Sequence, residues 1–222
     1  MEADMDATQP PISDTATARA YRALEGMIVT LALEPGSVLT EGALIDRVGL
    51  GRTPVREAIQ RLAWEGLIEV RPRAGIAIAA LQAADWPRVI EARLGVEIIL
   101  ARTAARFITP RLAESFRQAA VMMGNAAAGD DVPAFLEADK ALDESLAAAS
   151  DNPFAARLAA PLQTHSRRFW FRYQADKGLN ESAKRHMWVI RAILNGDEDA
   201  AIQETENLMS MLLDNARVAA RR

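Results

Sequence analysis

The chain has 222 residues, of which half are hydrophobic and a quarter are charged, so it suits one large or two modest globular domains. It contains no cysteine, which excludes disulfide bonds and thiolate metal sites and fits a reducing compartment. The formal net charge of −4 excludes a general binder of polyanions, so any contact with nucleic acid depends on where individual arginines lie. No apolar run approaches the roughly 20 residues that span a membrane.

The first 14 residues are polar and acidic, and they include Pro10 and Pro11. We interpret residues 1–14 as a disordered tail. This segment lacks the basic and then apolar layout of a signal peptide, so we expect a cytoplasmic protein without membrane contact.

Residues 15–81 have the pattern of a first domain that begins with helices. A first amphipathic helix ends before the turn at Pro35 and Gly36, and its apolar stripe consists of Ala20, Tyr21, Leu24, Met27, Ile28 and Leu31. A second, short helix follows, and Thr40 is its expected N-cap. A tight turn at residues 49–51 then leads into a third helix.

The third helix has one apolar and one polar face. The apolar face consists of Val55, Ala58, Ile59, Leu62 and Ala63, which is the spacing of a buried helix face. We expect Thr53 to be its N-cap and Pro54 its first residue. The polar face carries Arg52, Arg56 and Gln60. Most arginine-rich helices are solvated surface helices, but arginine can also bind guanine in a bidentate manner or grip a phosphate.

Two short strands follow the third helix. Residues 67–70 and 76–79 are apolar and β-branched enough to form strands, and the basic turn at residues 71–75 joins them as a wing. The order of elements therefore predicts a winged helix-turn-helix domain, which places its recognition helix in a DNA major groove.

This first domain resembles the N-terminal domain of GntR-family bacterial transcription regulators. The resemblance is carried by Glu34-Pro35-Gly36-Ser37-Val38-Leu39-Thr40-Glu41, Gly49-Leu50-Gly51-Arg52-Thr53-Pro54-Val55-Arg56-Glu57-Ala58, Leu62-Ala63-Trp64-Glu65-Gly66-Leu67-Ile68 and Pro72-Arg73-Ala74-Gly75. It implies that Arg52, Thr53 and Arg56 contact operator DNA. It also implies that a wing with Arg71, Arg73 and Gly75 lies along the minor groove.

Residues 82–222 have the pattern of an all-helical bundle. Asp85, Trp86 and Pro87 start a first helix, and the later helices are expected at about 110–123, 133–149, 154–173, 181–195 and from 198 onward, with a break at Gly124. The chain as a whole is therefore expected to be mainly α-helical, with a winged helix-turn-helix domain followed by the bundle.

The bundle resembles the FCD ligand-sensing domain of the FadR subgroup of GntR regulators. The matching residues are Glu91, Arg93, Glu97, Phe135 to Asp143, Ser150-Asp151-Asn152-Pro153, His186, Ile190, Ala192, Ile193, Gly196, Asp197 and Ala201. Many FCD domains bind a divalent metal through one Asp and three His.

Only two of those four metal positions keep the residue that the family uses. Asp139 and His186 match, but Asp143 stands where one histidine is expected, and Leu208, or Asn207 if the register slips by one residue, stands where the last is expected. Either Asp139, Asp143 and His186 still hold a Zn²⁺, Mn²⁺ or Mg²⁺ ion more weakly, or the metal site is lost.

Two further residues are candidates for binding an effector. Arg93 is expected to face the bundle interior, where it suits a carboxylate, unless it forms a structural pair with Asp139 or Glu97. His165 lies on the helix that carries Arg167, and it either contacts the effector or is a packed or surface histidine.

Together these features predict a transcription regulator rather than an enzyme. The resemblance implies a homodimer on a pseudo-palindromic operator, acting as a repressor that a small-molecule effector, an organic acid in our interpretation, controls. The alternative is a metal-dependent hydrolase or lyase that uses Asp139, Asp143 and His186, although no general base or nucleophile stands at a suitable spacing.

Overall fold

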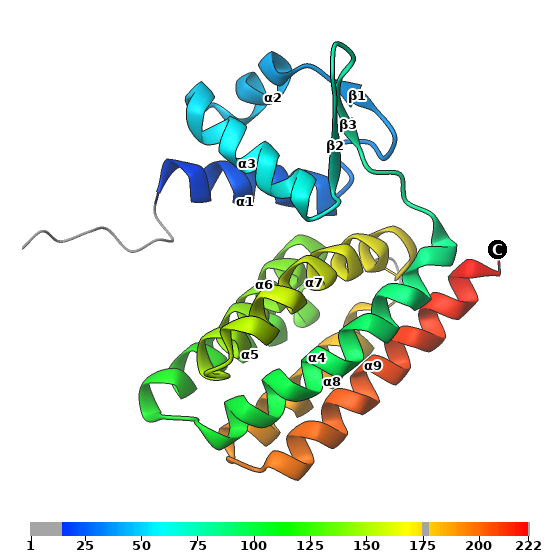
Figure 1. Cartoon of the computed structure of the whole chain (residues 1–222). Coiled ribbons are helices and arrows are strands. Elements are labelled where there is room, and N and C mark those ends of the chain that lie inside the picture. Colours follow the sequence, from blue (N-terminus) through cyan, green and yellow to red (C-terminus); the bar gives the residue numbers. More distant parts are fainter. Residues whose placement is uncertain (1–14, 175–177, 222) are drawn as a thin grey trace, which may run out of the picture. The chain divides into compact units, whose positions relative to one another are not determined.

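The computed structural model describes residues 15–174 and 178–221, and the predicted acidic tail of residues 1–14 lies outside them. The chain divides into two compact units, residues 1–80 and 81–222. Helices predominate in both units (Figure 1). Among the described residues, no helix is both long and apolar enough to cross a lipid bilayer.

The first unit combines helices with a small antiparallel sheet. Its elements are α1 (Ala16–Val29), β1 (Val38–Leu39), α2 (Glu41–Val48), α3 (Arg52–Trp64), β2 (Ile68–Arg71) and β3 (Gly75–Ile78). The sheet order is β1-β3-β2, with Val38 and Glu69 both paired to Ala77. Strand β1 is absent from the sequence-based prediction because two residues carry no alternation, and only their pairing with β3 makes them a strand.

The core of this unit is formed by the faces that the apolar spacing predicts. It consists mainly of Leu24, Ile28, Leu44, Val55, Ala58, Ile59, Leu62, Leu67, Ile76 and Ile78. At its edge the Tyr21 hydroxyl donates a hydrogen bond to Glu65 over 2.7 Å, and the Arg61 guanidinium lies 3.8 Å from the centre of the Tyr21 ring. These contacts fix α1 against α3.

Helix α3 begins earlier than the sequence predicts. Its N-cap is Gly51, which offers no side-chain hydrogen bond, so the prediction that Thr53 caps the helix and Pro54 starts it is wrong. Pro54 is tolerated in the first turn because the N–H groups there have no partner within the helix. The backbone N–H groups at this end of α3 are therefore left without a side-chain cap.

Gly75 makes the close approach between the wing and β1 possible. Its φ angle is 115°, in a region that side-chain-bearing residues rarely adopt. A Cβ atom there would lie 2.6 Å from the backbone oxygen of Leu39. Gly75 is half-buried, so it has a steric reason to be glycine apart from any contact with DNA.

The second unit is a helical bundle preceded by the short 3-10 helix η2 (Ala83–Asp85). Its helices are α4 (Trp86–Arg106), α5 (Pro110–Ala128), α6 (Val132–Ala149), α7 (Pro153–Gln174), α8 (Leu179–Leu194) and α9 (Glu198–Ala220). Helix α4 packs along α9 and α7, and α5 packs along α6 (Figure 1). The predicted break at Gly124 is wrong, because α5 continues to Ala128. Burial of Met123 and Ala126 outweighs the roughly 1 kcal/mol that a glycine costs inside a helix.

An aromatic stack fixes the register of α4 against α7. The buried ring of Trp86, at the start of α4, stacks on Phe169 with centroids 6.0 Å apart and on Tyr173 with centroids 5.9 Å apart. This register decides which side chains of α4 and α7 meet inside the bundle.

The Gly75 geometry gives a first prediction. Gly75→Ala should lower the free energy of unfolding of the first unit by about 1–3 kcal/mol, because the new methyl group meets backbone that cannot move away. Thermal or urea unfolding of the full chain measures this loss. The control is Gly26→Ala in α1, where an added Cβ meets nothing within 4 Å and should stabilise the helix by about 0.5–1 kcal/mol. Equal stability of Gly75→Ala and the unmodified chain would contradict the steric role.

Candidate functional site

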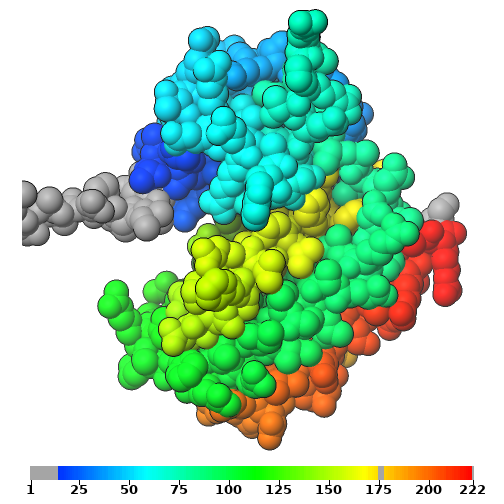
Figure 2. Space-filling model, in the orientation of Figure 1, coloured from blue at the N-terminus to red at the C-terminus, as the bar shows by residue number. Residues whose placement is uncertain are grey.

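The exposed face of α3 presents the residues that the sequence predicts for DNA contact. Arg52, Thr53, Arg56 and Gln60 are all exposed, and the side chains of Arg52 and Arg56 are 72% and 57% accessible. The cyan segment that contains α3 reaches the surface of its unit (Figure 2). Arg52, Arg56 and Gln60 follow each other at intervals of four residues, so they form one row along the helix.

Glu41 of α2 holds the two arginines of this row, a contact that sequence reasoning missed. The Nε atom of Arg56 donates to both carboxylate oxygens of Glu41 at 2.8 Å, and the Nε atom of Arg52 lies 3.8 Å from the same carboxylate. Exposed ion pairs of this kind add little stability. Their effect is to orient the guanidinium groups, and a phosphate or base has to compete with Glu41 for them. The only feature of the sequence that pointed to this contact was the position of Glu41, directly after Thr40, the expected N-cap of the helix.

The wing carries the other predicted contacts. Arg71 of β2 is exposed and pairs with Glu69 over 2.8 Å. Arg73 is exposed in the turn with a positive φ of 66°, and within the described residues it makes no ion pair. The structure therefore places both arginines on an accessible surface, and their contact with DNA stays a prediction.

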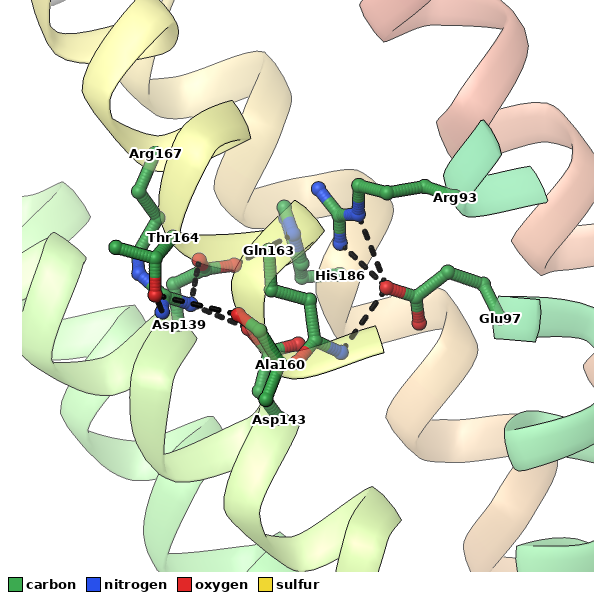
Figure 3. A network of polar contacts seen from close by, with 9 residues as sticks. All are labelled: Arg93, Glu97, Asp139, Asp143, Ala160, Gln163, Thr164, Arg167 and His186. Atoms are coloured by element: carbon green, nitrogen blue, oxygen red, sulfur yellow. Dashed lines mark hydrogen bonds and ion pairs between the residues drawn. The ribbon is translucent and has the colours of Figure 1, made fainter. Parts of the chain in front are cut away.

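The second candidate site is a cavity inside the bundle. It has a volume of about 20 Å³ and is lined by Arg93, Phe135, Leu136, Asp139, Ser166, Arg167, Trp170, His186 and Leu212. A cavity of this size holds about one water molecule. Charged side chains from α4, α6, α7 and α8 converge around it (Figure 3).

Arg93 forms the structural pair with Glu97 that the sequence left open. Its Nε and Nη2 atoms donate to one oxygen of Glu97 at 3.0 and 2.8 Å, and Gln163 of α7 donates to the same oxygen at 3.0 Å. All three side chains are buried. Arg93 also lines the cavity, and its Nη1 atom has no hydrogen-bond partner in the described part of the chain.

His186 links α8 to Asp139 of α6. Its Nε2 atom lies 2.9 Å from Asp139, and its Nδ1 atom lies 2.6 Å from the backbone oxygen of Ser182. Burial lowers the pKa of His186, but the hydrogen bond and charge of Asp139 outweigh burial and raise it above its ordinary value. Burial likewise raises the pKa of Asp139, but the hydrogen bond from His186 and the nearby cations hold it well below its usual range.

Arg167 of α7 joins both aspartates, and sequence reasoning assigned it no role. Its Nη1 atom donates a hydrogen bond to Asp143 and lies 3.4 Å from Asp139, while Nη2 donates to Thr164 over 3.1 Å. Burial and the charge of Asp139 raise the pKa of Asp143 to about 8, despite the opposing charge of Arg167.

The predicted metal-binding set is not assembled. In residues 15–174 and 178–221, no group of three or more His, Cys, Asp or Glu side chains is arranged to hold a metal ion. Asp143 is held by Arg167 instead, and Leu208 is a buried apolar side chain. The ligand set of Asp139, Asp143 and His186 therefore does not fit a divalent ion in this structure.

His165 is not among the residues that line this cavity, and its contact with an effector stays a prediction. The next two residues, Ser166 and Arg167, line it in its place. One residue along a helix turns a side chain by about 100°, which moves His165 away from the interior. Its neighbours Gln163, Thr164, Arg167 and Trp170 form the buried stripe of α7, and this spacing is the signal that could have identified Arg167.

Comparisons with known proteins agree on both units. The FCD domain family matches residues 88–211, and the family described as bacterial regulatory proteins, gntR family, matches residues 16–78. An uncharacterized HTH-type transcriptional regulator of Agrobacterium vitis is 34% identical over 132 residues, which cover 58% of this chain and 77% of the relative. A probable D-xylose utilization operon transcriptional repressor of Paenarthrobacter nicotinovorans is 28% identical over 198 residues, which cover 89% and 87%.

The fold is shared with a solved structure of low sequence identity. The structure of E. coli McbR/YncC superposes with a TM-score of 0.76 at 17% identity, over 92% of this chain and 98% of that one.

The buried acids and His186 predict how the stability of the second unit depends on pH. The folded state raises the pKa of Asp143 to about 8 and raises that of His186, so it holds protons that the unfolded state releases. The free energy of unfolding should therefore fall as the pH rises from about 4, the ordinary pKa of an aspartate, to about 8, by at most about 1.4 kcal/mol per pH unit for each proton, and His186 adds to this fall only above its ordinary pKa of about 6.5. Urea unfolding at a series of pH values measures this.

Two variants test which residue causes this pH dependence of the free energy of unfolding. Asp143→Asn replaces the protonated acid by a neutral side chain of the same shape and should flatten the dependence between about pH 4 and 6, where His186 is protonated in the folded and unfolded states alike. Asp214→Asn, an exposed change on α9, should leave it unaltered. A slope that survives in this range in Asp143→Asn would show that Asp143, which faces Asp139, Glu97, Arg93 and Arg167, is not the group that retains its proton.

Proposed function

Because this chain belongs to the gntR family of bacterial transcription regulators and carries their FCD domain, we propose that it represses transcription as a homodimer and is released from its operator by a small-molecule effector. Its function as a DNA-binding transcription regulator follows from the family. The homodimer, the repression and the effector are the parts that we propose.

One observation supports the mode of DNA binding most strongly. The row of Arg52, Arg56 and Gln60 is exposed at an end of α3 that has no side-chain cap. Uncapped N–H groups and arginines at a helix N-terminus suit phosphate and the edges of guanine. Two such helices in a two-fold dimer would enter successive major grooves about 34 Å apart, so the operator would be a pseudo-palindrome.

Repression is supported by a relative. The Paenarthrobacter protein that matches most of this chain is named as a probable repressor. A regulator of this kind acts on the chromosome, and we place this chain in the cytoplasm.

The cavity beside Arg93 supports an effector with a carboxylate group. Arg93 lines it together with His186 and Arg167, and these donors suit an anionic oxygen. Since the cavity holds about one water molecule, the effector would bind only when the bundle opens around it. Its differential affinity for the open and closed bundle would then set the change in operator affinity, typically about 1–3 kcal/mol.

We also propose that the chain is not an enzyme. The hydrolase or lyase alternative required Asp139, Asp143 and His186 to ligate a metal ion. Those side chains are instead tied to one another and to Arg167, so no observation favours the alternative.

DNA recognition by α3 gives the first test. An operator selected from random DNA by the purified chain should lose about 5- to 150-fold in affinity with Arg52→Ala or Arg56→Ala, because each variant removes a guanidinium from the recognition row. Arg117→Ala, which removes an exposed arginine of α5, is the charge-matched control. Unchanged operator affinity in both α3 variants would contradict the proposed recognition surface.

Effector binding gives the second test. A thermal-shift screen of small carboxylic acids should yield a ligand that raises the melting temperature and weakens operator binding. Arg93→Lys keeps the charge but loses the fork of donors, so it should lose most of the shift. Arg88→Lys, on the exposed side of the same helix, should retain it. An undiminished shift in Arg93→Lys would sink the assignment of Arg93, and a screen that yields only uncharged ligands would sink the carboxylate class.

A further inference from the structure

We propose that the guanidinium of Arg167 is the resident cation of the bundle site, so this chain holds its two buried aspartates, and binds its effector, without a metal ion. The first part stands on geometry alone, and the part on the effector rests on the function proposed above.

Two carboxylates on one buried helix face need a cation. Asp139 and Asp143 lie four residues apart on α6, so they share a face, and their side chains are only 9% accessible. Burying an ionised carboxylate without a partner is very costly, and Asp139 stays ionised even where Asp143 keeps its proton. In metal-binding proteins a divalent ion supplies the positive charge for such a pair.

Arg167 supplies that charge from the neighbouring helix. Its Nη1 atom contacts both aspartates, and Nη2 is anchored to Thr164, as Figure 3 shows. The Arg167 side chain is only 8% accessible, so it belongs to the buried interior of the bundle rather than to its surface. The planar guanidinium has several donors and stays charged at any physiological pH.

The position of the Arg167 guanidinium leaves no favourable place for a metal ion. An ion bound to Asp139 or Asp143 would lie next to the guanidinium that contacts both, and like charges in a dry interior repel strongly. A divalent ion also needs at least four ligands at about 2.0–2.6 Å. The residue expected as the last ligand is Leu208, which is buried and donates nothing. The remaining space of about 20 Å³ has room for one water rather than a hydration shell.

It follows that an effector has to meet the protein's own cations directly. No metal mediates between its carboxylate and the bundle, so Arg93, Arg167 and His186 set its orientation. Ligand recognition then depends on hydrogen-bond donors in fixed positions, and chelators should leave it intact.

The test is a metal titration of the full-length chain. After treatment with EDTA, the chain should bind neither Zn²⁺ nor Mn²⁺ stoichiometrically by calorimetry and native mass spectrometry, and EDTA should not shift its melting temperature. Arg167→Met keeps an apolar stem and removes the guanidinium, whose volume then becomes free for the water molecules that would complete the shell of an ion held by Asp139, Asp143 and His186. It should melt lower in EDTA, acquire one divalent ion per chain, and regain part of its melting temperature with that ion. The control Arg172→Met removes an exposed arginine from the same helix and should do neither.

Three outcomes would overturn the inference. The first is one divalent ion per unmodified chain that is lost in Asp139→Ala, and the second is a folded Arg167→Met that gains no metal affinity. If Arg167→Met does not fold, Arg167→Lys keeps a cation in place and should fold without metal, and metal binding by that variant is the third. Operator binding of the same EDTA-treated sample is a separate readout, whose loss would count against the proposed function but not against the metal-free site.

Discussion

The bundle depends on the pairing of charges that its helices bury. Asp139 and Asp143 of α6 are tolerated inside the protein because Arg167 of α7 and His186 of α8 contact them. Arg93 is tolerated because it pairs with Glu97, whose carboxylate also accepts a hydrogen bond from Gln163. A buried charge that loses its partner costs several kcal/mol, so these pairs penalise any sliding of one helix along another. The apolar core makes the bundle stable, and the charge pairs fix its register.

In the first unit, polar contacts between helices serve a different purpose, which is to hold α3 in place. Arginines are exposed on one face of α3 while the opposite face is packed, and α3 therefore needs an anchor that does not use this exposed row. The contacts of Tyr21 with Glu65 and Arg61 provide that anchor at the far end of the helix. Thr17 of α1 adds a hydrogen bond to Glu57. The row of Arg52, Arg56 and Gln60 is thus positioned by the packing of α3, and among residues 15–174 and 178–221 the two arginines form ion pairs only with Glu41.

Sequence reasoning identified the family, the fold class and most helices, because these depend on local periodicity and on short motifs. It missed β1, which exists only through pairing with β3, and it misplaced the start of α3 because Thr53 and Pro54 look like a cap and a first residue. It brought Asp139 and His186 together by resemblance. Arg167 escaped because its partners lie 24 and 28 residues away. The spacing of the buried stripe on α7 indicates which side chains face inward, but the residues that they meet are set by the packing of Trp86 on Phe169.

The small size of the bundle cavity has a kinetic consequence. A site with a free volume of only about 20 Å³ would admit the larger effector that we propose only during the fraction of time in which the helices separate. The apparent affinity is then the intrinsic affinity reduced by that fraction. Association should reach a limiting rate as ligand is added, because opening of the bundle rather than collision becomes the slow step. Such a regulator would register a sustained supply of its ligand and ignore a brief pulse.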